Sequence, residues 1–293
     1  MTTPRGTRQL YALALAGVLA LGAAHGVRAE DADHPKDKPF AFAVDMGFAP
    51  FAFKTPAGEV TGFSIEFAKE IARRLGRPGI EAIDVNYSAI FAGLFAKRYE
   101  AIMAPTNITA ERSKQMLFTQ GYMATGLGFL TSAKAEGVKG VEEMKGKVLA
   151  VNNGSISDTW ATENAAKYGW TVERFDKNAD AVEAVLTERA WANVADLPVS
   201  QYVATQNKAL KVDYIFYTGR SFGLAFRPDD KAFRREVEDA VKCMKLDGTL
   251  AAINEKWFKA PPGAETAMRQ LWFGYGPPGF EGYEAAAATL LCR

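Results

Sequence analysis

Residues 104–122 read Ala104-Pro-Thr-Asn-Ile-Thr-Ala-Glu-Arg112-Ser-Lys-Gln-Met-Leu-Phe118-Thr-Gln-Gly-Tyr122. The residues before them, Tyr99 to Met103, form an apolar run that is typical of a strand. Thr109 is a good helix N-cap residue and an acidic residue follows in the first turn, so we predict a short helix that contains Arg112. A bend between the strand and this helix is predicted at Pro105, Thr106 and Asn107. This bend would direct backbone groups, the amide of Asn107 and the guanidinium of Arg112 toward the same binding position.

Arg112 has the side chain in this stretch that best suits an anionic ligand. A guanidinium is a planar fork that holds a carboxylate through two parallel hydrogen bonds. The spacing alone leaves another interpretation open, because an arginine on a short helix is often only a solvated surface residue.

The bulk composition is that of a globular protein. The chain has 293 residues, of which 48% are hydrophobic and 24% charged, enough for one large domain or two smaller lobes. From Phe40 onward, strand-like and helix-like segments alternate, for example a strand at 40–45, a helix at 64–75 and a strand at 80–85. This rhythm predicts α/β architecture with parallel strands.

The N-terminus has the pattern of a secretory signal peptide. Arg5 and Arg8 precede an apolar run from Leu10 to Leu21, and Val27-Arg28-Ala29 offers small residues where a signal peptidase reads. The apolar run is shorter than the roughly 20 residues that a membrane span needs. We therefore predict cleavage after Ala29 and a periplasmic location, with a retained anchor helix as the alternative.

Charge, histidine and cysteine content exclude several functions. Removing residues 1–29 takes away three of the 35 basic residues and leaves 32 against 34 acidic ones, which argues against nucleic-acid binding. Only His25 and His34 are present, so a histidine relay or a histidine-bound metal in the folded body is not expected. Cys243 and Cys292 are predicted to form a disulfide in an exported protein, with two free thiols as the alternative.

Several separated motifs give the chain a family resemblance. Thr109-x-x-Arg112 and Phe118-Thr-x-x-Tyr122 resemble the centre of the periplasmic solute-binding proteins of family 3, the amino-acid receptors of ABC importers. Further motifs occur in the same order as in that family: Gly62-Phe-Ser-Ile-Glu66, Gly154-Ser-Ile-Ser157, and Asp247-Gly-Thr249 followed by Lys256-Trp-Phe258. The resemblance extends from about Phe40 to Phe258.

The resemblance implies a two-lobed periplasmic-binding-protein fold of type II, in which each lobe is a mixed sheet flanked by helices. The chain would cross between the lobes twice, near 122–126 and 220–224. The expected organisation is a signal peptide at 1–29, a flexible leader at 30–38, a first lobe from 39–124 plus 222–258, a second lobe at 125–221, and a C-terminal extension at 259–293. The extension is too apolar for a free tail, so we expect it to pack on the folded lobes. It would either serve a purely structural role or contact the permease.

An α-amino acid carries two opposite charges, and burying either without a partner is costly. The resemblance implies that Arg112 takes the ligand carboxylate and that Asp196, after the apolar strand at 191–195, takes the ammonium group from the other lobe. Open α/β sheets bind ligands at the carboxyl ends of their strands, which suits this position. Asp196 could instead be only the N-cap of the next helix.

The remaining expected ligand contacts lie in three places. The loop from Asn152 to Ser157 follows a strand and opens a helix, so its N–H groups suit a carboxylate, and Ser155 matches the family's carboxylate-binding hydroxyl. A phosphate site is less suitable there, because no Gly-x-x-x-x-Gly-Lys motif is present. The full set of predicted ligand contacts is Asp45, Phe48, Tyr87, Ala104, Pro105, Thr106, Asn107, Arg112, Asn152, Ser155, Ile156 and Asp196.

Within this set, Asp45, Phe48 and Tyr87 match the acid and the two aromatic residues that line the side-chain pocket in relatives, although aromatic rings near strand ends often belong to the core. Pro105 and Asn107 depart from the small residues and hydroxyls of relatives, and Ile156 narrows the pocket. We expect a polar or cationic amino acid as the ligand, an ABC permease as the partner, a monomer, and neither cofactor nor metal.

Two other function classes remain open from the sequence. The first is a periplasmic enzyme on the same fold, a cyclohexadienyl or prephenate-type dehydratase, for which Asp45, Asp196 or Tyr87 would have to supply a proton. The second is a sensor module that acts through a partner. The interpretation we favour is a binding protein without catalytic residues.

Overall fold

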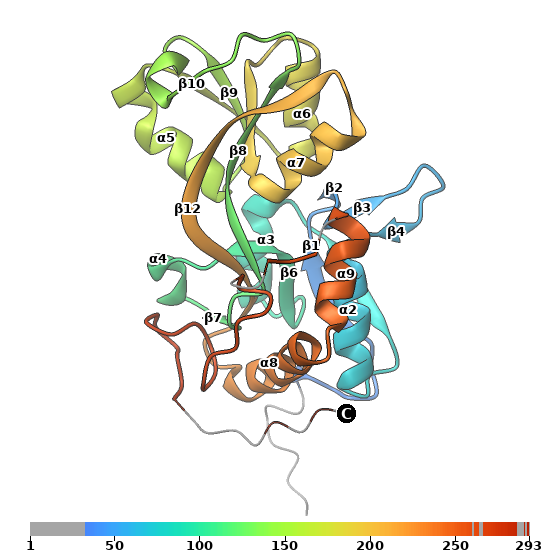
Figure 1. Cartoon of the computed structure of the whole chain (residues 1–293). Coiled ribbons are helices and arrows are strands. Elements are labelled where there is room, and N and C mark those ends of the chain that lie inside the picture. The colour runs from blue at the N-terminus through green and yellow to red at the C-terminus, as the bar shows by residue number, and fades with distance from the viewer. Residues whose placement is uncertain (1–32, 260, 264–265, 286–289, 291, 293) are drawn as a thin grey trace, which may run out of the picture.

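The computed structural model describes residues 33–259, 261–263, 266–285, 290 and 292. They form two lobes joined by two long strands (Figure 1). The signal peptide predicted at 1–29 lies outside the described residues. A nine-stranded sheet runs through both lobes in the order β10-β9-β11-β8-β12-β6-β1-β5, with β7 added beside β12.

The first lobe is built on three parallel strands with helices packed against them. Its main elements are β1 Phe40–Val44, β5 Ile80–Asp84, β6 Ala101–Asn107, α2 Phe63–Arg74, α3 Tyr87–Phe95, α8 Lys231–Leu246 and α9 Thr249–Phe258. Smaller elements are β2 Gly47–Phe48, β3 Ala52–Lys54, β4 Val60–Thr61, α4 Ala110–Ser113 and β7 Leu117–Phe118. The apolar residues of α2 recur on one face, and Phe67, Ala68 and Ile71 are buried, as the helical spacing predicts.

The second lobe repeats this plan with three parallel strands of its own. Its elements are η1 Val141–Met144, β9 Val148–Asn152, α5 Ile156–Tyr168, β10 Thr171–Phe175, α6 Asn178–Leu186, β11 Ala192–Asp196 and α7 Leu197–Gln206. Phe129, Leu149 and Val194 are fully or almost fully buried in its core. Ala195 and Val199 of this lobe pack into the hydrophobic cluster of the first lobe, so the two lobes are in contact.

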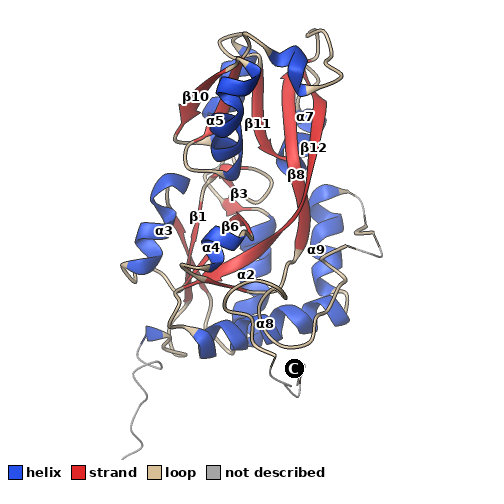
Figure 2. Ribbon diagram, turned by 90° about the vertical axis from the view of Figure 1, so that its left-hand side faces the viewer, coloured by secondary structure: helices blue, strands red, loops and turns tan. Residues whose placement is uncertain are grey.

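Two antiparallel strands connect the lobes. β8 Met123–Ser132 and β12 Leu210–Phe226 pair along almost their whole length, from Ser132 opposite Leu210 to Met123 opposite Phe222. Figure 2 shows both strands rising from one lobe into the other. We predicted two separate strands, 212–217 and 222–226, but β12 is continuous, because β8 holds it across two register shifts.

The expected bend at 105–107 is instead the end of a strand. β6 runs to Asn107, which is paired with Phe222, and Thr106 is paired with Gly223. Proline lacks the N–H that a sheet needs, yet Pro105 is tolerated because the register of β12 against β6 shifts between Gly223 and Ala225. The helix that follows was predicted correctly: Thr109 is its N-cap, and its hydroxyl accepts a hydrogen bond from the backbone N–H of Arg112.

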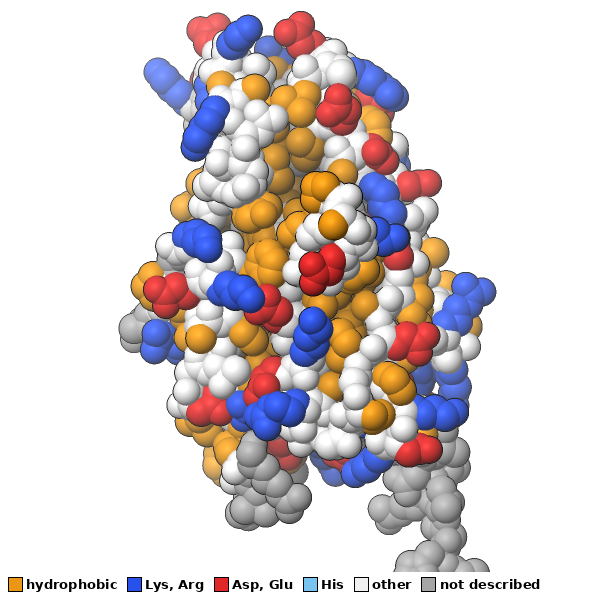
Figure 3. All heavy atoms as spheres, turned by 90° about the vertical axis from the view of Figure 1, so that its right-hand side faces the viewer, with side chains coloured by type: hydrophobic (Ala, Val, Ile, Leu, Met, Phe, Trp, Pro, Cys, Tyr) orange, Lys and Arg blue, Asp and Glu red, His pale blue; other side chains and the backbone are white. Residues whose placement is uncertain are grey.

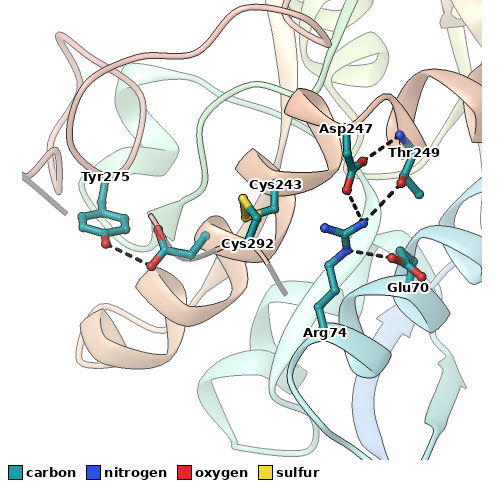
Figure 4. The surroundings of a disulfide bond; sticks show 8 residues. Glu70, Arg74, Cys243, Asp247, Thr249, Tyr275 and Cys292 are labelled. Atoms are coloured by element: carbon teal, nitrogen blue, oxygen red, sulfur yellow. Dashed lines mark hydrogen bonds and ion pairs between the residues drawn. A yellow bond between two sulfur atoms is a disulfide. The ribbon is translucent and has the colours of Figure 1, made fainter. Parts of the chain in front are cut away.

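The described part of the C-terminal extension contacts α8 and the segment after β7. Met268 and Tyr275 are buried. The amide of Gln120 donates to the carbonyl of Trp272 at 2.7 Å and accepts from its N–H at 2.8 Å. The predicted disulfide between Cys243 and Cys292 is present (Figure 4).

The described part of the predicted leader, from residue 33 on, is held by side-chain contacts. His34 is buried and stacks on Phe233 of α8 at 3.8 Å between ring centroids. Its ring nitrogens lie 3.1 Å from Glu100 and 3.1 Å from Asp230, two acidic residues far away in the chain. Local sequence patterns do not predict this contact, because it depends on residues from three distant segments.

Candidate functional site

The carboxyl ends of the parallel strands in both lobes point toward the place where the two lobes meet. Asp45, Asp84 and Asn107 stand at or just after the ends of β1, β5 and β6, and Asn152 and Asp196 end β9 and β11. Nearly all the predicted site residues therefore come from strand ends or from the loops that follow them, where open α/β sheets bind ligands. We call this region the cleft.

Arg112 lies at the edge of the cleft with its guanidinium over aromatic rings. Its Nη1 donates to the backbone carbonyl of Asn107 at 3.1 Å. Its Cζ lies 5.1 Å from the ring centroid of Phe91 and 5.9 Å from that of Tyr87. Stacking on two rings fixes the plane of the guanidinium at little cost in hydration, because this cation is weakly hydrated.

Asp196 approaches the same point from the second lobe. Its Oδ1 accepts a hydrogen bond from the amide of Asn107 at 2.9 Å and another from the hydroxyl of Thr125 at 3.1 Å. The side chain is only 4% exposed, and this burial raises the pKa of Asp196 to about 6. The two hydrogen bonds and the positive charge of Arg112 oppose that rise. Asp196 also stands at the N-cap position of α7, but its side chain makes no capping hydrogen bond.

Asn107 therefore contacts both charged residues that were predicted to hold the ligand, Arg112 and Asp196. Its carbonyl oxygen faces Arg112, and its side-chain amide reaches Asp196. The cation and the anion come from different lobes and converge on one residue. This arrangement offers opposite charges to a small molecule that takes the place of the amide.

Other predicted contacts surround this point. Ala104, Pro105 and Thr106 are buried on β6, and the hydroxyl of Thr106 donates to the carbonyl of Ala104 at 2.8 Å. Tyr87 packs edge-on against Phe91. Phe48 is 8% exposed and belongs to the first lobe's core cluster, so its ring serves packing as well as any ligand.

The loop after β9 faces the beginning of α3 in the first lobe. Gly154 has a φ of +75°, and a Cβ there would lie 3.1 Å from the Cα of Ser88, next to Tyr87. The hydroxyl of Ser155 accepts from the N–H of Asp158 at 3.1 Å as the N-cap of α5. It keeps its own proton available for a ligand oxygen.

Two residues of this loop have structural contacts. The amide of Asn152 donates to the carbonyls of Phe175 and Asp176, and so ties the end of β9 to the end of β10. Ile156 packs against the core of the second lobe. The carboxylate of Asp158 accepts from the N–H of Gly154 at 3.0 Å, so this N–H already has a partner.

Lys177 is a cleft residue that we did not predict. It follows β10 and its ammonium group lies 3.0 Å from Asp45 and 2.8 Å from Asp84, both in the first lobe. Burial raises the pKa of Asp45, and the hydrogen bond from Lys177 works against the rise. The sequence signal that was available is its place directly after a strand end, in Asp176-Lys177-Asn178.

Two buried polar atoms near the cleft have no hydrogen-bond partner among the described residues. They are Oδ2 of Asp45 and the hydroxyl of Tyr122. Burial raises the pKa of Tyr122 well above its ordinary value, and the charge of Asp196 adds to this rise. Buried polar atoms are normally paired, so an unpaired acceptor at a strand end marks a place where a ligand donor fits.

Neither a cluster of metal-ligand side chains nor a membrane-spanning helix occurs among the described residues. In these ranges, no group of three or more His, Cys, Asp or Glu side chains is arranged to hold a metal ion. No described helix combines the length and the apolar character that crossing a membrane requires. Figure 3 shows charges of both signs interspersed with hydrophobic side chains on one face, rather than a field of one sign.

Comparison with known proteins finds relatives along most of the chain. The family model described as bacterial extracellular solute-binding proteins, family 3, matches residues 40–260. The L-cystine-binding protein TcyJ of Escherichia coli (strain K12) is 30% identical over 217 residues, which cover 73% of this chain and 80% of that protein.

Solved structures agree with this match. A structure of an ancestral arginine-binding protein bound to arginine superposes with a TM-score of 0.72 at 29% identity, covering 76% of this chain and 99% of that chain. The ancestral amino acid-binding protein AncCDT-1, a precursor of cyclohexadienyl dehydratase, superposes with a TM-score of 0.71 at 30% identity, covering 78% and 99%.

Proposed function

Because the chain belongs to family 3 of the bacterial extracellular solute-binding proteins, we propose that it is a receptor that binds a small amino acid between its lobes and delivers it to an ABC-type importer in the membrane. The observation that carries the proposal is the convergence of Arg112 and Asp196, from different lobes, on Asn107. A zwitterion in a dry site needs a partner for each charge. A cleft with one guanidinium and one carboxylate meets that need.

In this proposal the ligand takes over the contacts that Asn107 now makes. Arg112 and the free proton of Ser155 hold the ligand carboxylate. Asp196 and a backbone carbonyl near Pro105 hold the ammonium group. Asp45, Phe48 and Tyr87 face the ligand side chain, while Asn152 and Ile156 support the loop that carries Ser155.

Closure of the lobes completes the site. The proposed lobes are 39–124 plus 222–258 and 125–221, and the proposed hinge lies where β8 and β12 leave the first lobe. Among the described residues, two strands connect the lobes, so a small change in their twist moves one lobe as a body. The closed form then presents a surface to the permease, with the receptor acting as a monomer.

The names of the relatives favour a receptor over an enzyme. The structures and the curated relative described above are called binding proteins, for cystine, arginine and amino acids. The structure linked to a dehydratase is itself called an amino acid-binding protein. Residues 1–29 are proposed to be cleaved on export to the periplasm, which mass spectrometry of the secreted protein would test.

The decisive experiment is a thermal-shift screen of the exported protein with the twenty amino acids, followed by calorimetry. A ligand at 100 times its Kd stabilises the folded state by about 2.7 kcal/mol, which gives a clear rise in Tm. Arg112→Ala is expected to abolish the shift without lowering the Tm of the ligand-free protein. Lys114→Ala, an exposed cation two residues away, is the matched control. The absence of a shift with every amino acid would contradict the proposal.

A further inference from the structure

Lys177 reaches across the cleft to Asp45, the residue proposed above to face the ligand side chain. It is the N-cap residue of α6 in the second lobe, and both of its ion-pair partners belong to the first lobe. The aliphatic part of its side chain lies against Gly47 of β2, where an added Cβ would be 3.0 Å from the Cβ of Lys177. Glycine at position 47 thus leaves room for the side chain to reach across.

The two carboxylates that Lys177 contacts differ in their surroundings. Asp45 is 1% exposed, so its charge needs a partner within the protein. The side chain of Asp84 is 40% exposed and is largely screened by water. Since the ammonium group lies 3.0 Å from Asp45, the buried charge is already balanced. A second cation placed beside Asp45 would be repelled by Lys177 at short range.

Asp45 still has a free place for a hydrogen-bond donor. Its Oδ1 accepts from Lys177 and from the N–H of Gly47, whereas its buried Oδ2 has no partner among the described residues. An uncharged donor, such as an amide or a hydroxyl, would satisfy Oδ2 without adding charge. A cationic side chain would supply a donor but would bring the repulsion described above.

We propose that Lys177 is a specificity-determining residue: it supplies from the second lobe the positive charge opposite Asp45, so that the cleft selects amino acids with uncharged hydrogen-bonding side chains over cationic ones. This inference rests on the proposed function and narrows its ligand class. The sequence predicted a polar or a cationic amino acid as the ligand, and this inference keeps only the polar, uncharged class.

L-Citrulline and L-arginine are suitable probes, because they share length and shape and differ in side-chain charge. Calorimetry on the full exported chain is expected to show citrulline binding at least tenfold more tightly than arginine. Lys177→Met, which keeps an unbranched side chain that is one atom shorter and removes its charge, is expected to reverse this order. Lys177→Arg keeps the charge and is expected to keep the preference.

Lys167→Met is the control, because Lys167 is a lysine of the same lobe that stacks on Tyr168 away from the first lobe. It should leave the ratio of the two affinities unchanged. The inference is overturned if the wild-type protein prefers arginine, if Lys177→Met leaves the ratio within twofold, or if only apolar amino acids bind. If no amino acid binds, the result counts against the proposed receptor function. That outcome can be distinguished from failure of the specificity inference, in which amino acids bind but Lys177 does not decide between them.

Discussion

The cleft and the surroundings of α8 both bury charged side chains. In the cleft, Asp45 and Asp196 have hydrogen-bond partners in the opposite lobe, and one oxygen of Asp45 has none within the described part of the chain. Around α8, Lys245 donates to three backbone carbonyls, and Glu238 accepts from the N–H of Gly276 at 2.8 Å. A disulfide then fastens the chain end to the same helix.

The difference lies in how easily the partners separate. The partners around α8 lie on segments of the first lobe and the extension, so separating them requires local unfolding. The partners in the cleft lie on two lobes, which β8 and β12 join in the part of the chain that the structure describes. We infer that charges of the first kind serve stability and those of the second kind serve ligand exchange, and the following measurements test this division in order of expected effect.

The largest effect is expected from removing the disulfide. Cys243→Ser with Cys292→Ser opens a loop that spans a sequence separation of 49 residues. The chain-entropy model gives a loss of about 4 kcal/mol in the free energy of unfolding. Denaturant unfolding would measure that loss, while ligand affinity should stay the same. A tenfold loss of affinity would mean that the two regions are not independent.

The second largest effect is expected at Asp196. Asp196→Asn keeps the shape and removes the anion, and the ligand ammonium then loses its partner at a cost of about 3 kcal/mol, or over a hundredfold in Kd. The Tm of the ligand-free protein should not fall, because a buried charge has been removed. Glu238→Gln around α8 is the mirror control: it should leave affinity unchanged. If the Kd of Asp196→Asn for the ligand is within threefold of the wild-type value, Asp196 has only a structural role.

A smaller effect is expected from Lys245→Met. Burial lowers the pKa of Lys245 to about 8, yet its ammonium group holds the carbonyls of Gly121, Ala267 and Gln270. Methionine fills the space but leaves these acceptors without a donor, at a cost of about 1–3 kcal/mol. Hydrogen exchange should rise in residues 266–285. Unchanged exchange there would show that the lysine does not hold the extension.

The pH dependence of the cleft gives the next prediction. The pKa of Asp196, about 6, is raised above its ordinary 3.8. The stability that this group contributes is therefore fully present below 3.8 and is lost as pH rises through about 6. Ligand affinity changes in the opposite direction, because the ammonium group needs the ionised form. Lowering the pH from 7 to 5 should weaken binding about tenfold. Asp196→Asn should lose this dependence.

The smallest effect is expected at His34, which packs on α8. Burial lowers its pKa, but the hydrogen bonds with Asp230 and Glu100 outweigh burial and raise the pKa above 6.5. Its contribution to stability is thus full below 6.5 and is lost as pH rises through the raised value. His34→Gln should lower the Tm more at acidic than at alkaline pH. An equal fall in Tm at acidic and at alkaline pH would show that the His34 ring stabilises the protein only by packing.

Much of the fold could be predicted from local patterns. β1, α2 and β5 lie within one residue of the bounds predicted at 40–45, 64–75 and 80–85, and Thr109 caps α4 as its residue type suggests. Such elements depend on neighbours within a few positions. The continuity of β12 could not be predicted, because its middle contains turn-forming Thr218 and Gly219, which bulge at a register shift while β8 pairs with the residues on both sides of them.

The candidate site divides in the same way. Its residue types and their places after strand ends were readable, and family motifs supplied expected roles for Arg112 and Asp196. Lys177 was missed because its partners Asp45 and Asp84 lie 132 and 93 positions away. The bridging role of Asn107 was also unforeseen, since its amide meets a residue 89 positions later.

The sequence by itself determined the α/β alternation, the cysteine pair and which chemical groups stand at the ends of strands, because these follow from residue type and short-range spacing. The tertiary structure alone decided which charges meet. Ion pairs and hydrogen bonds act over a few ångströms, and only the packing of two lobes brings distant positions of the chain within that range.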